Sequence, residues 1–202
     1  MPPLESTPPL PLDRAASSLR ALALALEQRD AYTDHHCDRV SRLAWLLGRQ
    51  FDLDRERLDH LALAARFHDV GKIGVRDDVL LHPGRLDPPR RAQMDAHAEM
   101  GEQLFLATGR DDAGAVARLI RHHHEAFDGS GYPDGLAGAQ IPLEARILTV
   151  ADGYDAMTSK RPYRLPMPPH TALHVLADES GLRIDPEVYR QLRTVLRATP
   201  DA

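Results

Sequence analysis

A histidine and an aspartate stand side by side at His68 and Asp69, within the stretch FHDVGKIG (67–74). An adjacent imidazole and carboxylate offer a metal ion one nitrogen and one oxygen, and a carboxylate can bridge two ions. In isolation, such a pair is more often simply solvated or hydrogen-bonded. The pair gains weight because the chain supplies further candidate ligands at His36, His97, His123, His124 and Asp152.

The candidate histidines fall at helical spacing with apolar residues, which predicts that they point inward. His36 shares a face with Val40 and Leu43, whereas His35 falls on the polar side of the same helix, and His122 is expected nearer solvent. For any one inward histidine, a hydrogen bond to a backbone carbonyl is the simpler explanation. Five of them, together with two carboxylates from separate helices, instead predict a dimetal site in the core of a helical bundle.

The donor types narrow the choice of metal. Nitrogen and oxygen ligands without thiolate suit iron, manganese or zinc and fit calcium poorly. Seven protein ligands are too many for one tetrahedral ion, but they fit two ions that share a carboxylate.

Helices must position these residues, because no stretch alternates with the period of two that is typical of a strand. A glycine-rich loop is predicted at 128–142 and a basic, proline-punctuated loop at 159–169. The sequence therefore predicts an all-α fold without repeats. The expected helices cover about 13–30, a segment that starts at Thr33 or Asp34, and then about 54–67, 88–107, 111–124, 143–158, 170–180 and 186–197.

Composition excludes several classes of protein. The chain has 202 residues, 43% of them hydrophobic, and a formal charge of −5, which argues against a broad surface for polymeric nucleic acid. Its one cysteine, Cys37, rules out an internal disulfide and suits the cytoplasm. No signal peptide or membrane span is recognisable. Residues 1–12 hold five of the 16 prolines, which predicts a flexible arm before a single domain at 13–199.

Longer motifs carry a resemblance to a known family. These are HDVGKIG (68–74), HHEAFDGSGYPDGLAGAQIP (123–142) and ARILTVADGYDAMTSKRPYR (145–164). Together they resemble the HD-GYP domain, a subgroup of the HD metal-dependent phosphohydrolases. The match begins at RDAYTDHHCDRV (29–40) and reaches RIDPEVY (183–189), most of the chain. The resemblance implies an HD-domain helical bundle with a GYP-containing loop, additional C-terminal helices, and hydrolysis of cyclic di-GMP to pGpG, with GMP as a further product left open.

The resemblance also implies residue roles. It assigns one ion to His36, His68, Asp69 and Asp152. It assigns the other to Asp69, His97, His123 and His124, with Asp69 as the bridge. Asp69 and Lys72 are the implied catalytic residues, and the groups implied near the substrate phosphates are Lys72, Tyr132, Arg161 and Arg164. The two arginines lie in a loop just past Asp152, where guanidinium groups can neutralise a phosphodiester.

Two ions, iron or manganese, are the expected cofactors. Some family members carry a glutamate one helical turn before the first histidine, which recruits a third ion, but this chain has Tyr32 there. The hypothesis for the chemistry is attack on phosphorus by a hydroxide that bridges the two ions. Two alternatives stay open. One is a phosphohydrolase for another cyclic dinucleotide or nucleotide. The other is a non-catalytic adaptor that binds the nucleotide and docks a GGDEF-type or other regulatory protein.

Overall fold

The computed structural model describes residues 21–22, 33–160 and 165–198. Over these residues the chain is helical, and its only bridge of β type joins Ser180 and Ile184. The predicted all-α fold is therefore confirmed. The arm at 1–12, most of the helix expected at 13–30, and Tyr32 lie outside the described residues.

The described elements follow one another along the chain, with a long glycine-rich connection between α7 and η3. They are α2 (Thr33–Gln50), α3 (Arg55–Phe67), the 3-10 helix η2 (Val70–Gly74), α4 (Asp77–Leu80), α5 (Pro88–Asp95), α6 (His97–Leu106), α7 (Ala113–His122), the 3-10 helix η3 (Gly138–Gln140), α8 (Leu143–Thr158), α9 (Pro169–Asp178) and α10 (Pro186–Ala198). None of the described helices combines the length and the apolar character needed to span a membrane.

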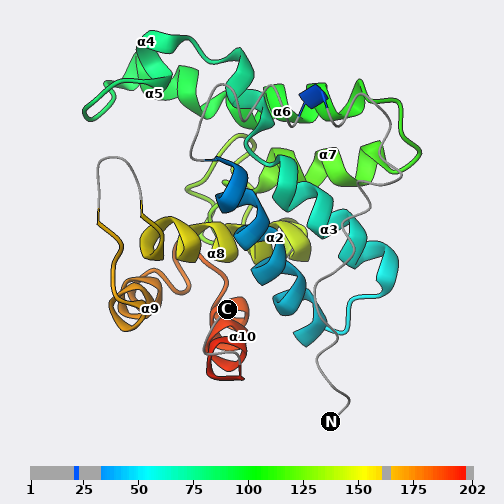
Figure 1. The fold of residues 1–202 in the computed structure, drawn as a ribbon, viewed down its shortest axis with the longest axis vertical. Coiled ribbons are helices and arrows are strands. Elements are labelled where there is room, and N and C mark those ends of the chain that lie inside the picture. The colour runs from blue at the N-terminus through cyan, green and yellow to red at the C-terminus, as the bar shows by residue number, and fades with distance from the viewer. Residues whose placement is uncertain (1–20, 23–32, 161–164, 199–202) are drawn as a thin grey trace.

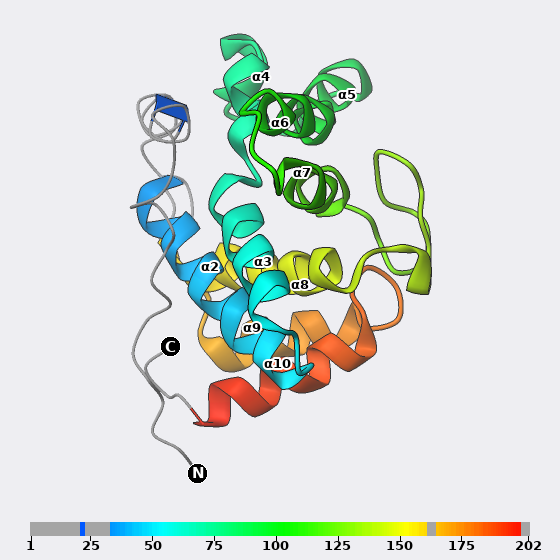
Figure 2. The ribbon, with the colours of Figure 1, turned by 90° about the vertical axis from the view of Figure 1, so that its right-hand side faces the viewer.

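The helices are stacked in layers. Helices α6, α7 and α8 lie one below another, α2 and α3 pack across them, and α9 and α10 lie beyond α8 (Figures 1 and 2). Large side chains from several layers are fully buried between the helices, among them Phe67, Phe105, Leu47, Ile120 and Leu148. Burial of apolar surface on this scale is the main force that holds the helices in register.

The HD pair lies at a junction between two helices. Asp54 caps the start of α3, where its side chain accepts a hydrogen bond from the backbone N–H of Arg57 (2.9 Å). At the other end α3 stops at Phe67, His68 is its C-cap, and Asp69 precedes η2. The chain changes here from an α-helix to a 3-10 helix. His68 and Asp69 lie at this change and are both buried in the bundle interior.

Glycine at position 71 permits the closest approach between helices. A Cβ placed on Gly71 would lie 1.9 Å from the carbonyl oxygen of His97 and 2.6 Å from the backbone nitrogen of Gly101. No side chain fits at such distances. The backbone of η2 can therefore lie directly on α6, which brings Asp69 next to His97.

One predicted helix was wrong in its extent. The sequence indicates a single helix over 88–107, but the structure has α5 and α6 with a break at Ala96. At the break, the carbonyl oxygen of Met94 accepts a hydrogen bond from the ring nitrogen Nδ1 of His97 (2.7 Å). This side-chain bond is formed within the helical run, so apolar spacing gave no sign of it. The other predicted helices whose two ends lie in the described region agree within two residues.

We expect Gly71→Ala to lower the free energy of unfolding by at least about 2 kcal/mol, because η2 and α6 must separate to admit the methyl group. Chemical denaturation of the metal-free protein measures the change. Gly114→Ala is the control, because nothing lies within 4 Å of its Cβ position. Its stability should stay the same or rise slightly. Equal stability of the two variants would contradict the close packing of η2 on α6.

Candidate metal centre

Five parts of the chain bring the predicted ligands into one buried site. His36 comes from the first turn of α2, the HD pair from the junction of α3 and η2, and Asp152 from α8. His97 begins α6, and the remaining histidines follow directly after α7. The structure brings together all seven predicted residues, namely His36, His68, Asp69, His97, His123, His124 and Asp152.

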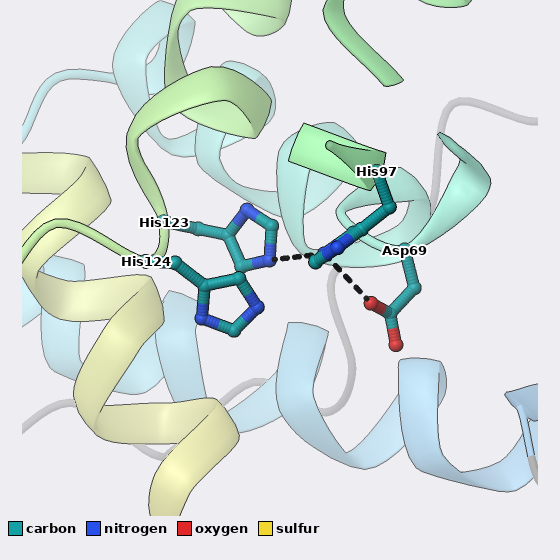
Figure 3. Close-up of side chains that lie close together, drawn as sticks. All are labelled: Asp69, His97, His123 and His124. Atoms are coloured by element: carbon teal, nitrogen blue, oxygen red, sulfur yellow. Dashed lines mark hydrogen bonds and ion pairs between the residues drawn. The ribbon is translucent and has the colours of Figure 1, made fainter. Parts of the chain in front are cut away.

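The ligand atoms form two groups that share one carboxylate. Asp69, His97, His123 and His124 have ligand atoms within 4.8 Å of one another (Figure 3), and so do His36, His68 and Asp69. Asp152 joins the second group, since its Oδ1 lies 3.2 Å from Nε2 of His36 and 3.8 Å from Nε2 of His68.

The two oxygens of Asp69 face different groups. Oδ1 lies 3.5 Å from Nε2 of His97, and Oδ2 lies 3.4 Å from Nε2 of His68. Two ligands of one ion with bonds of about 2.1 Å stand roughly 3.0–3.5 Å apart. The observed separations therefore suit one ion on each side of the Asp69 carboxylate.

Three of the histidines are oriented in the same way, by a hydrogen bond to a backbone carbonyl at the end of a helix. His68 and His123 are the C-caps of α3 and α7, and His97 follows shortly after the last residue of α5. The last carbonyls of a helix have no partner within the helix. Each ring uses Nδ1 to bond the carbonyl three residues earlier: Ala65 (2.8 Å), Met94 (2.7 Å) and Ile120 (2.6 Å).

These bonds fix the tautomers of the three rings. A carbonyl oxygen only accepts, so Nδ1 carries the proton, and in the neutral rings of His97 and His123 Nε2 presents a lone pair. The Nε2 atoms of His97 and His123 face each other at 3.4 Å (Figure 3), and with both Nδ1 atoms protonated neither Nε2 of the neutral rings carries a proton. Opposed lone pairs in a buried site repel, and a shared cation would remove that conflict. The residues present thus fit a divalent ion.

The histidine pKa values shift in opposite directions in the two ligand groups. Burial lowers the pKa of His97, His123 and His124, the last to about 3, so these rings are neutral ligands at physiological pH. Burial alone would also lower the pKa of His36, but its hydrogen bonds with Asp152 and Asp155 raise it to about 9. A metal ion bound by His36 must therefore displace a proton.

Lys72 lies at the shared carboxylate. Its Nζ is 2.6 Å from Oδ2 of Asp69. Burial alone would raise the pKa of Asp69, but Lys72 and His68 hold that pKa well below its ordinary range. The carboxylate is therefore ionised and ready to bind cations. The predicted substrate contacts Arg161 and Arg164 lie outside the described residues.

The glycine-rich loop brings a tyrosine to the histidine cluster. The ring of Tyr132 lies 5.0 Å from that of His124 and 6.5 Å from that of His97, centroid to centroid. A Cβ on Gly131 would be 2.1 Å from the backbone nitrogen of Ala126, so only glycine fits there. The predicted neighbour of the site is thus placed beside it.

Glu125 anchors this loop, a role that its position in the sequence did not predict. Its buried carboxylate accepts hydrogen bonds from the backbone N–H groups of Asp134 (2.8 Å) and Leu136 (3.0 Å). Arg121 also holds the loop against α6, because its guanidinium donates hydrogen bonds to Asp134 (2.7 Å) and to Glu102 of α6 (2.8 Å). The position of Glu125 directly after two candidate ligands could have drawn attention to it.

The prediction for His122 was wrong. It was expected nearer solvent, but its exposed fraction is 7% because the loop folds over it. Its Nδ1 lies 3.6 Å from carboxylate oxygens of both Glu125 and Asp134. His122, Glu125 and Asp134 thus form a third cluster of possible ligands. Because Arg121 already neutralises Asp134, we interpret this cluster as part of the contacts by which Glu125 and Arg121 hold the loop.

The pH dependence of the metal-free protein tests the electrostatics. His124 has an ordinary pKa of 6.5 and a folded pKa of about 3, so the unfolded chain takes up the proton first. The stability due to this neutral ring is complete above pH 6.5 and is lost as pH falls toward 3, by up to about 1.4 kcal/mol per pH unit. We expect His124→Gln to lose less stability than the native protein between pH 6.5 and 5, as measured by denaturant unfolding. Equal losses would contradict a neutral His124.

Comparisons with known proteins agree with this geometry. A family model described as HD domain matches residues 4–188. The cyclic di-GMP phosphodiesterase response regulator RpfG of Xanthomonas campestris is 40% identical, with 86% of this chain and 46% of that protein covered. The 3'3'-cGAMP-specific phosphodiesterase 3 of Vibrio cholerae is 37% identical, with 95% and 42% covered. This chain therefore spans less than half the length of either relative.

A solved structure shares the fold. Bd1817, an HD-GYP-type protein from Bdellovibrio bacteriovorus, superposes with a TM-score of 0.65 at 21% identity, with 93% of this chain and 60% of that chain covered. At this identity the likeness concerns the fold alone. The family match over most of the sequence confirms the resemblance drawn from the motifs, and the chain belongs to the HD domain family.

Proposed function

We propose that this chain is a metal-dependent phosphodiesterase that hydrolyses cyclic di-GMP in the cytoplasm. The observation that carries the proposal is the pair of buried ligand groups that share Asp69. Nitrogen and oxygen ligands arranged around a shared carboxylate are typical of dimetal hydrolases. Relatives named cyclic di-GMP phosphodiesterases over the same region support the choice of substrate.

Two divalent ions, iron or manganese, would occupy the site. The ligands proposed for one ion are His36, His68, Asp69 and Asp152. Those proposed for the other are Asp69, His97, His123 and His124. When bound, such ions supply positive charge for the phosphoryl oxygens and lower the pKa of a coordinated water to about 7.

The side chains around the ligands would bind and orient the substrate. Lys72 lies at Asp69, and we propose that its ammonium group turns to a phosphate oxygen and stabilises the charge that develops there. Tyr132 lies beside His124 and His97, from where it can stack on a guanine base. Burial raises the pKa of Tyr132, so its phenol stays protonated and can donate a hydrogen bond. Arg161 and Arg164 are proposed as further phosphate contacts.

A second substrate deserves a direct comparison. Relatives named 3'3'-cGAMP-specific phosphodiesterases also match this chain, one over 95% of its length. That dinucleotide differs from cyclic di-GMP in one base, whereas the metal centre acts on the phosphodiester common to both. The base-binding side, which includes Tyr132, would decide between them. The complete ligand set argues against a purely non-catalytic adaptor, which would not need it.

The first test is hydrolysis by protein purified without oxygen and supplied with manganese or ferrous iron. We expect turnover of cyclic di-GMP, and Asp69→Asn should keep the helical fold but bind fewer ions and lose turnover, because Asp69 serves both groups. Chromatography follows the products, and elemental analysis counts the ions.

Asp78→Asn removes an exposed carboxylate and should behave as the native protein does. Native-like turnover in Asp69→Asn would refute the mechanism, and faster hydrolysis of 3'3'-cGAMP would reassign the substrate.

Lys72 should separate substrate binding from metal binding. We expect Lys72→Gln to keep its ions but to lose about 100-fold in kcat/KM, because a donor to the developing charge is removed. Steady-state kinetics and metal content are measured on the same samples. Arg76→Gln removes an exposed cation nearby and should leave the kinetics unchanged. Loss of metal from Lys72→Gln would show that its role is structural support of Asp69.

A further inference from the structure

His36 is oriented differently from the histidines at the helix ends. His68, His97 and His123 bond backbone carbonyls in the last turn of a helix. His36 lies instead in the first turn of α2, and the start of a helix leaves N–H groups without partners rather than carbonyls. Its Nδ1 bonds a side chain of α8, the Oδ2 atom of Asp155, at 2.7 Å.

Asp155 is itself held firmly. It is only 5% exposed, and the guanidinium of Arg39 grips both of its oxygens, with Nε to Oδ1 at 2.6 Å and an Nη to Oδ2 at 3.0 Å. Ser159 adds a hydroxyl bond to Oδ1 at 3.0 Å. The carboxylate therefore stays in place and charged, although it lies outside the ligand groups.

We propose that Asp155, held by Arg39, is the positioning residue for His36, and that it sets the affinity of the ion bound by His36 without affecting the other ion. This inference rests on the proposed metal centre. A carboxylate that accepts from the outer nitrogen of a ligating imidazole fixes the ring and makes the other nitrogen a stronger donor. A backbone carbonyl does so more weakly, because it carries no charge.

The arrangement makes the two ion sites unequal. The site with His36 has three carboxylates in or next to it, Asp69, Asp152 and Asp155, one of them balanced by Arg39. The site with His97, His123 and His124 has Asp69 as its one carboxylate ligand, and its His97 and His123 rings are fixed by backbone carbonyls. A side-chain partner can be removed by substitution, whereas a carbonyl cannot. Asp155 therefore offers a way to weaken one ion selectively.

Asp155→Asn is the sharpest variant, because the amide keeps the shape of the side chain, removes its charge and replaces one acceptor oxygen with an NH2 group. Arg39 would not be left buried and unpaired, since its side chain is 44% exposed, so the fold should persist. Manganese titration of the metal-free protein, with free ion measured by EPR, gives both affinities without any substrate. We expect one ion to bind about 10–100-fold more weakly and the other to bind as in the native protein.

Asp185→Asn is the matched control. Asp185 is also 5% exposed and also pairs with an arginine, Arg146, but it touches none of the ligands. Its loss should lower stability and leave both manganese affinities unchanged. Arg39→Gln should weaken the same ion as Asp155→Asn by a smaller factor, and the double variant should be no weaker than Asp155→Asn alone.

Weakening of both ions to the same extent in Asp155→Asn, or of neither, would overturn the inference. So would an equal effect in Asp185→Asn, since the effect would then be one of general stability. These readouts involve no nucleotide. A native protein that binds two ions but leaves cyclic di-GMP intact would refute the proposed function and leave the role of Asp155 to be judged on the titration.

Discussion

The main constraint on this structure is a set of buried nitrogen lone pairs that face one another and repel. The neutral rings of His97 and His123 are directed at each other in the bundle interior, beside the ionised carboxylate of Asp69, where each would be costly without a partner. The hydrogen bonds that hold the rings have already used the Nδ1 protons. The inner nitrogens therefore cannot satisfy each other. Bound cations would resolve the conflict, and the fixed rings preorganise the site for them at a cost to the stability of the metal-free protein.

Helix ends do most of the work of positioning. A helix that stops offers free carbonyls, and a histidine placed at the stop turns its ring back onto one of them. This happens at the ends of α3, α5 and α7, which come together because Gly71 lets η2 lie against α6. His36, in the first turn of α2, follows no helix end and needs another partner, and α8 supplies it with Asp155. The same helix carries Asp152, so α8 supplies both a proposed metal ligand and the residue that orients His36.

Much of this could be predicted from the sequence, because helical spacing shows which histidines share a face with apolar residues. Helical spacing placed His36, His97 and Asp152 on inward faces. It did not foresee the break at Ala96, which depends on a side chain bonding a carbonyl of its own helix. Nor did it find the roles of Glu125 and Asp155, or the burial of His122. These depend on which loop or helix packs over the residue, and periodicity carries no information about that.

The central claim is that seven side chains hold two ions on either side of the Asp69 carboxylate. Crystals of the manganese-loaded protein, measured at wavelengths where manganese scatters anomalously, test it most directly. The account predicts two anomalous peaks per chain, one among His97, His123 and His124 and the other between His36 and Asp152, with Asp69 between them. A single peak, or ligand side chains turned away from the manganese positions, would contradict it.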